Sequence, residues 1–362
     1  MSELLGKHQL KFILFILVLL AVIPLITASN SVPSGEAGSN SFKYKGAVLA
    51  HIHRIGNGYG SRPSKAMHSH LSSVGYDTVQ LNTFAYMRNR KETEVISDRD
   101  PTMAEKYMVA EIENLQELGF KVMLKPHIWI GGHNLDSDNW RNKIDFEDPL
   151  ERKEWFSSYG KFILSEAELA EETSVEILVI GTELVGLCKY TKEWKALISD
   201  VRDVYSGKLT YAAEGMNAKK IEFWNVLDYI GIDAYFPLSK KSNPTLKELV
   251  SGWYKYEPAV RELSRKYNKK VIFTEIGYKS VEGTTIKPWE WSKDGKVSQE
   301  EQALAYEATS VVFNDKPYLA GVFVWKYFTD MNSYERGNIP RGFTPYGKKA
   351  ETIISGWFGS QQ

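Results

Sequence analysis

From Tyr44 to the C-terminus, short apolar runs rich in β-branched residues alternate with longer amphipathic stretches. This alternation is typical of parallel strands covered by helices, because a strand buried on both faces is apolar throughout and a covering helix has one apolar face. Eight runs occur, which predicts an α/β fold of the closed (β/α)₈ (TIM) barrel type as a single domain. The runs are Lys45–Ala50, Thr78–Asn82, Lys121–Lys125, Glu176–Ile180, Leu209–Ala213, Tyr229–Asp233, Val271–Thr274 and Ala320–Trp325.

Helical candidates with apolar residues at three-to-four spacing lie between the runs. The alternative fold is a doubly wound open sheet, but the segment from Ala50 to Gly56 lacks the G-x-G-x-x-G turn that binds phosphate in such sheets. The closed barrel is therefore favoured. The helices are expected at Met103–Leu118, Leu150–Glu171, Trp194–Tyr205, Leu246–Lys266 and Gln299–Phe313.

The N-terminus has the order of an export signal. Basic residues precede an apolar run from Phe12 to Ile26, and small residues follow it. The run is near the lower length limit for a membrane span, so a cleaved signal peptide and a retained anchor are both open. Either one predicts a periplasmic or extracellular protein. The expected organisation is an export segment at 1–28, a flexible linker at 29–43 and the barrel at 44–362.

Composition narrows the ligand class. The 45 Lys and Arg balance the 45 Asp and Glu, so no overall field attracts nucleic acid or an anionic membrane surface. Aromatic residues make up 13% of the chain, and flat rings suit both sugar stacking and core packing. The single cysteine, Cys188, excludes an intrachain disulfide and a multi-cysteine zinc site. We therefore expect a neutral polysaccharide or oligosaccharide as ligand, and no cofactor.

In a (β/α)₈ barrel the chemistry takes place at the carboxyl ends of the strands. Glu183 follows the fourth run and Glu275 follows the seventh, on opposite walls of the barrel. Glycosidic cleavage needs one carboxylic acid to protonate the leaving oxygen and one carboxylate to attack or to activate water. We expect Glu183 and Glu275 to form this pair. The candidates for substrate binding at other strand ends are His51, Asn82, Lys125, His127, Trp129, Asp233, Tyr235, Tyr278 and Trp325.

Four aromatic residues have expected roles around this pair. Tyr235 is placed to hydrogen-bond Glu275 and keep it ionised, while Glu183 needs a raised pKa to carry a proton. Trp325 forms a floor under the sugar ring or packs at the end of the barrel. In the loop after the seventh run, Trp289 and Trp291 line a distal sugar subsite or pack within their loop.

Five segments at strand ends share the pattern of a known family: Val122–His127, Gly181–Leu184, Asp228–Pro237, Phe273–Tyr278 and Gly321–Trp325. They resemble the strand ends of the glycoside hydrolase family 113 β-mannanases. The resemblance extends from Tyr44 to the C-terminus and implies a retaining endo-β-1,4-mannanase, with Glu183 as acid/base and Glu275 as nucleophile. Much of the larger clan has Asn before the acid/base, in contact with the sugar 2-hydroxyl, whereas this chain has Thr182.

Two other functions are compatible with a barrel. His51 and His53 close the first run in the way that metal-dependent amidohydrolases begin, but such a site needs further histidines later in the chain, and all seven lie in its first part. No metal site is therefore predicted. A carbohydrate-binding barrel without catalysis is the second alternative, against which the presence of both carboxylates argues. His68 and His70 lie in a helical stretch and are expected at the surface.

Overall fold

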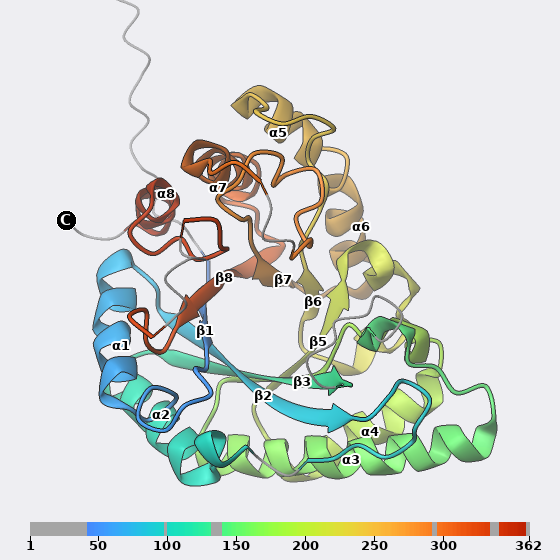
Figure 1. Cartoon of the computed structure of the whole chain (residues 1–362). Helices are drawn as coiled ribbons and strands as arrows, with labels where there is room; N and C mark the ends of the chain where they lie inside the picture. Colours follow the sequence, from blue (N-terminus) through green and yellow to red (C-terminus); the bar gives the residue numbers. More distant parts are fainter. Residues whose placement is uncertain (1–41, 98–99, 132–139, 292–294, 334–339, 360–362) are drawn as a thin grey trace, which may run out of the picture. The chain divides into compact units, whose positions relative to one another are not determined.

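Eight parallel strands pair in chain order, and β8 returns to β1 to close the barrel, as the sequence predicts (Figure 1). The computed structural model describes residues 42–97, 100–131, 140–291, 295–333 and 340–359, within one compact unit. The expected export segment and most of the linker lie outside the described residues. The strands are β1 (Tyr44–Ala50), β2 (Thr78–Met87), β3 (Lys121–Ile130), β4 (Ile177–Thr182), β5 (Lys208–Glu214), β6 (Ile230–Asp233), β7 (Val271–Ile276) and β8 (Leu319–Phe328).

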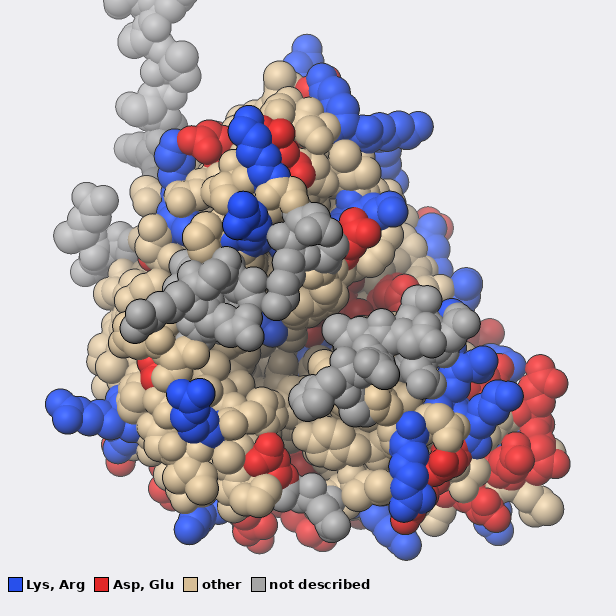
Figure 2. Space-filling model, viewed as in Figure 1, with Lys and Arg blue, Asp and Glu red and all other residues tan. Residues whose placement is uncertain are grey.

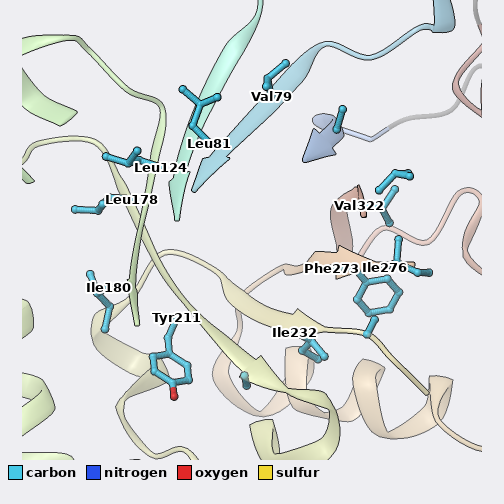
Figure 3. Packing of buried hydrophobic residues seen from close by; sticks show 14 of the residues in the cluster. Val79, Leu81, Leu124, Leu178, Ile180, Tyr211, Ile232, Phe273, Ile276 and Val322 are labelled. Carbon is cyan, nitrogen blue, oxygen red and sulfur yellow. The ribbon is translucent and has the colours of Figure 1, made fainter. Parts of the chain in front are cut away.

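Side chains on these strands face either the barrel interior or the surrounding helices. The outward set packs under the helices, as Figure 3 shows for Leu124, Leu178 and Tyr211 on β3, β4 and β5. The interior is filled by a separate apolar cluster that includes Val48, Met123, Ile177, Ile272 and Phe323. Because apolar side chains fill the interior, the polar residues gather at the carboxyl ends of the strands.

Eight α-helices cover the barrel in the described part of the chain, and none of them has the length and apolar character needed to cross a membrane. One prediction is wrong: Leu246–Lys266 forms two helices, not one. Pro258 lacks a backbone N–H and would clash with the preceding turn of one continuous helix, whereas the first turn of a new helix accepts it. The helices are α1 (Arg62–Val74), α2 (Glu105–Glu117), α3 (Pro149–Glu172), α4 (Thr191–Val204), α5 (Leu246–Trp253), α6 (Glu257–Tyr267), α7 (Gln299–Phe313) and α8 (Lys349–Phe358).

The expectation of a surface position is also wrong for His68. This residue is fully buried between α1 and α2, and its Nε2 lies 2.8 Å from Glu111 Oε1. Glu111 also accepts hydrogen bonds from Ser64 Oγ (2.6 Å) and from the backbone N–H of Gly60 (2.7 Å). His68 lies one turn from other buried positions of α1, so its burial follows the apolar face of the helix. His70 is half-buried and contacts Glu351 Oε1 at 2.8 Å.

Candidate active site

Charged side chains from distant parts of the chain meet at the carboxyl ends of the strands. Lys125 on β3 reaches Asp233 on β6 and Glu275 on β7, which are 108 and 150 positions away. Figure 2 shows a hollow at the centre of the viewed face, with acidic and basic atoms beside it. The barrel therefore gathers polar groups at the end of the strands where chemistry occurs in this fold.

Glu275 lies one residue before the end of β7, beside a bulge that decides where its side chain points. Ile272 faces the interior, so strict alternation along the strand would turn Glu275 toward the helices. The register of β7 against β8 shifts after Phe273, and Glu275 faces inward. Lys125 Nζ lies 2.6 Å from its Oε1, and the hydroxyl of Tyr235 donates to its Oε2 at 2.8 Å. The hydrogen bond expected from Tyr235 is present, and both carboxylate oxygens accept one.

Lys125 is fully buried and joins two carboxylates. Its Nζ lies 2.7 Å from Asp233 Oδ1, which also accepts a hydrogen bond from Thr274 Oγ1 at 2.8 Å. Burial opposes the charge of Lys125, but Asp233 and Glu275 outweigh it and raise the pKa of the ammonium. Burial and the charge of Glu275 raise the pKa of Asp233 well above its usual range. Lys125 thus stays charged and holds Glu275 in one orientation.

Glu183 follows β4 in a left-handed backbone conformation, with φ of 53°. This conformation costs a residue with a side chain about 1–2 kcal/mol. It is held by a hydrogen bond from the Glu183 N–H to Ala212 O (2.9 Å) on the neighbouring strand. Strain of this kind, maintained by the surrounding structure, is typical of functional positions. The preceding Thr182 donates its hydroxyl to Pro126 O at 3.1 Å.

The side chain of Glu183 has surroundings unlike those of Glu275. It is buried, and Arg141 Nη2 lies 2.8 Å from its Oε2. Burial raises the pKa of Glu183, the Arg141 charge acts against this rise, and the negative charge of Glu275 adds to it. The net effect is a raised pKa. The charges of the two glutamates therefore influence each other at one site.

Two further predicted residues line the same site with polar atoms that lack protein partners. His127 Nε2 and Trp325 Nε1 are buried and have no hydrogen-bond partner in the described parts of the chain. Burial, followed by the charges of Arg141 and Lys125, holds the pKa of His127 well below its usual range, so the ring is neutral. The Trp291 ring lies edge-on to Trp325, with 6.3 Å between centroids. These groups are available to a ligand.

The other predicted residues are engaged with the protein. Asn82 is buried and its Oδ1 accepts from Gln80 Nε2 at 3.0 Å. The Trp129 ring meets Phe84 of β2 at 6.4 Å. Tyr278 lies in the helix-facing layer with its ring 5.3 Å from Tyr306 of α7, so the structure does not bring it to the glutamates.

The two histidines after β1 also have protein partners. His51 Nδ1 accepts from the Tyr59 N–H at 3.0 Å, and its Nε2 lies 2.9 Å from Thr102 Oγ1. Burial, followed by the charge of His53, lowers the pKa of His51 to about 3. His53 Nδ1 lies 2.8 Å from Asp100 Oδ2. Within the described ranges, no three His, Cys, Asp or Glu residues are grouped to hold a metal ion.

Comparison with protein families identifies the chain. The model of Glycoside Hydrolase Family 113 matches residues 54–348, which include both glutamates and Lys125. The chain belongs to this family. It is a glycoside hydrolase, and the family resemblance found in the sequence is confirmed. A comparison of this chain with curated proteins finds no match.

Solved structures share the fold of this family 113 enzyme. A GH113 β-1,4-mannanase is 23% identical with a TM-score of 0.77, and the match covers 89% of this chain and 100% of that one. The GH113 β-mannanase of Alicyclobacillus acidocaldarius, solved in complex with ManMIm, is 24% identical with the same TM-score, over 89% and 98% of the two chains. The β-glucuronidase of Ruminococcus gnavus is 14% identical with a TM-score of 0.55, and the match covers 87% of this chain and 49% of that one.

The sequence analysis did not select two residues that the structure brings to the site of this family 113 enzyme. Arg141 lies in a short 3-10 helix between β3 and α3, outside any strand-end pattern. Lys326 directly follows Trp325 near the end of β8, and its charge acts on His127. The position of Lys326 at a strand end was the sequence feature that could have marked it as a candidate site residue. For Arg141 the sequence offered none, because loop paths do not follow from periodicity.

Proposed function

We propose that this family 113 enzyme is a retaining endo-β-1,4-mannanase in which Glu275 is the nucleophile and Glu183 is the acid/base. The observation that carries the proposal is the contrast between the two carboxylates. Both oxygens of Glu275 accept hydrogen bonds, one of them from an ammonium. Glu183 instead has a pKa raised by burial and by the charge of Glu275. When two neighbouring carboxyl groups have different surroundings, the group with the raised pKa is usually the acid and the other is the nucleophile.

In the first step, a Glu275 oxygen attacks the anomeric carbon from the face opposite the leaving group. The bond to the leaving oxygen breaks as Glu183 transfers its proton to that oxygen. The product is a glycosyl ester of Glu275 and a free sugar hydroxyl. Lys125 and Tyr235 orient the attacking carboxylate so that little reorganisation is needed during the reaction.

The second step uses the same residues with Glu183 acting as base. Esterification removes the negative charge of Glu275, which is one cause of the raised pKa of Glu183. The pKa of Glu183 therefore falls in the intermediate, as a base requires. Glu183 takes a proton from water, the water oxygen attacks the anomeric carbon, and the carboxylate of Glu275 leaves. Two inversions restore the original anomeric configuration.

The choice of mannan rests on the family and on the solved relatives, whose titles describe β-mannanases. A direct test is a panel of mannan, glucomannan, galactomannan, xylan, cellulose and β-1,3-glucan, assayed for released reducing ends. We expect the mannans to respond. A response to xylan alone would reject the substrate while keeping the reaction type, and mannan binding without any released ends would favour a non-catalytic barrel.

Stereochemistry and roles are tested separately. Retention requires carboxyl groups about 5 Å apart, and proton NMR of the first product should show the β-anomer. With an activated aryl substrate, Glu183→Ala should still form the intermediate, and azide should speed its turnover and yield a β-glycosyl azide. Glu275→Ala should remain several orders of magnitude slower with every leaving group, and any azide product should be the α-anomer. The reverse pattern would exchange the two roles.

We also propose that the enzyme acts outside the cytoplasm. The basic, apolar and small-residue order of residues 1–28 supports this, and polymeric mannan is too large to enter a cell readily. Fractionation of cells that produce the full chain tests the proposal. Activity confined to the cytoplasmic fraction would contradict it.

A further inference from the structure

Lys326 places an ammonium group over an aromatic surface beside the catalytic residues. Its Nζ lies 4.4 Å from the ring centroid of Trp325, 4.8 Å from that of Trp291 and 5.2 Å from that of Phe328. Within the described residues, and in contrast to Lys125, this ammonium has no carboxylate or carbonyl partner. Lys326 is therefore a charged donor without an acceptor.

Lys326 is half-buried, so its ammonium is only partly hydrated. Burial lowers the pKa of Lys326 to about 8, while the charge of Glu275 acts in the opposite direction. The side chain is therefore mainly protonated at neutral pH. Ring faces replace only part of the hydration of an ammonium group. A perturbed, unpaired lysine in a cleft beside catalytic groups is a candidate for ligand binding.

The neighbours of Lys326 share its lack of partners. Trp325 Nε1 and His127 Nε2 are buried without partners in the described ranges. Lys326 lies within electrostatic reach of His127 and of Glu275, since each pair influences a pKa. A buried polar atom left without a hydrogen bond is unfavourable. These unpaired atoms thus form one polar patch beside Glu275 that a sugar, with its many hydroxyls, is suited to satisfy.

The other two basic side chains beside the two glutamates are paired with carboxyl groups. Arg141 pairs with Glu183, and Lys125 pairs with Glu275 and Asp233. Lys326 has no such pair among the described residues, and the neutral mannan of the proposed function offers it hydroxyl oxygens as acceptors.

We propose that Lys326 is a substrate-binding residue that donates a hydrogen bond to a hydroxyl oxygen of the sugar unit bound at Glu275, and so contributes to sugar specificity. This inference rests on the proposed function and adds a contact to it. The sugar ring lies against Trp325, and the Lys326 ammonium reaches one hydroxyl at the edge of the ring. Nothing in the role of Lys326 involves proton transfer.

The test is a cycle that pairs variants with deoxygenated substrates. Wild type, Lys326→Met and Lys326→Arg are assayed on 2,4-dinitrophenyl β-mannobioside and on versions that lack one hydroxyl in the unit next to the leaving group. Lys326→Met removes the ammonium group and keeps an unbranched apolar stem that can pack on the rings. Lys266→Met is the matched control, because Lys266 also lies over a ring, that of Tyr267 at 5.0 Å, on the outer helix α6.

We expect Lys326→Met to lower kcat/KM on the parent substrate about 10- to 100-fold, the size of one charged hydrogen bond. One deoxy substrate should show wild type and Lys326→Met within about twofold of each other, while the others keep the full difference. Lys326→Arg should recover part of the loss, and Lys266→Met should show none. Equal losses on every deoxy substrate, or no loss on the parent, would overturn the proposal.

Two controls separate this proposal from the function on which it rests. Wild-type activity on the parent β-mannobioside tests the proposed function itself. If wild type cleaves another glycan of the panel instead, the deoxy series is built on that sugar, and the cycle decides on Lys326 independently. If wild type prefers uronate-containing substrates and Lys326→Met abolishes that preference, the partner is a carboxylate, and the assignment of a hydroxyl is wrong.

Discussion

Replacing Arg141 with Met should move the alkaline limb of the pH profile upward. Glu183 must be protonated to act as general acid, so the alkaline limb of kcat/KM reports its deprotonation. The Arg141 charge acts to lower the pKa of Glu183. Without that charge, burial and Glu275 act unopposed and the pKa rises further. Activity then persists to higher pH.

The magnitude follows from the geometry of the pair. The two contacting atoms lie 2.8 Å apart, and the side chains are only 9% and 10% exposed. With charge centres about 4 Å apart and an effective dielectric constant of about 20, the interaction is about 4 kcal/mol. That corresponds to about 3 pH units, and measured shifts from one neighbouring charge are about 1–3 units. We therefore expect the limb to rise by at least about one unit.

The assay is kcat/KM against pH on a soluble mannooligosaccharide for wild type and for Arg141→Met. Arg152→Met is the matched control, because Arg152 pairs with Glu193 between α3 and α4, outside the strand-end site. The control should keep the wild-type profile. An alkaline limb that stays in place, or that moves to lower pH, in Arg141→Met would refute the assignment of Glu183 as the group that titrates there.

Two further predictions concern the supports of the site and of the barrel. Tyr235→Phe removes the hydroxyl that donates to Glu275 Oε2, so kcat/KM should fall about 10- to 100-fold while the far-UV circular dichroism spectrum stays unchanged. An unaltered kcat/KM would show that this hydrogen bond does not position the nucleophile. Glu111→Ala removes the carboxylate that contacts Gly60, Ser64 and His68. The free energy of unfolding, measured in urea, should fall by about 3 kcal/mol. A loss below about 1 kcal/mol would contradict the structural role of these contacts.

The barrel could be predicted from the sequence because its strands are buried on both faces. Such strands appear as continuous apolar runs, and the polar residue after each run marks the mouth of the barrel. Glu183 directly follows the fourth run, so its place at the mouth follows from the sequence, but its direction does not, because the register of β4 shifts between Val179 and Thr182. Alternation gives no guide to Tyr278 either, because this residue lies beyond the end of β7.

Other parts of the site depend on irregular backbone that carries no periodic signal. The bulge after Phe273 turns Glu275 inward against the alternation of its strand. Arg141 reaches Glu183 through the path of a loop. The partners of His51 lie in two different loop segments, at Tyr59 and at Thr102, and occupy both of its ring nitrogens. Only the folded chain determines these contacts.

The central claim is that Glu275 becomes covalently bound to the sugar, and labelling tests it most directly. A 2-deoxy-2-fluoro-β-mannosyl fluoride slows both steps but keeps a good leaving group, so the intermediate should accumulate. After inactivation and tryptic digestion, mass spectrometry should find one fluoroglycosyl group on the peptide of residues 271–279, which contains Glu275. A label on the peptide of residues 162–189, which contains Glu183, or inactivation without any covalent label, would contradict the account.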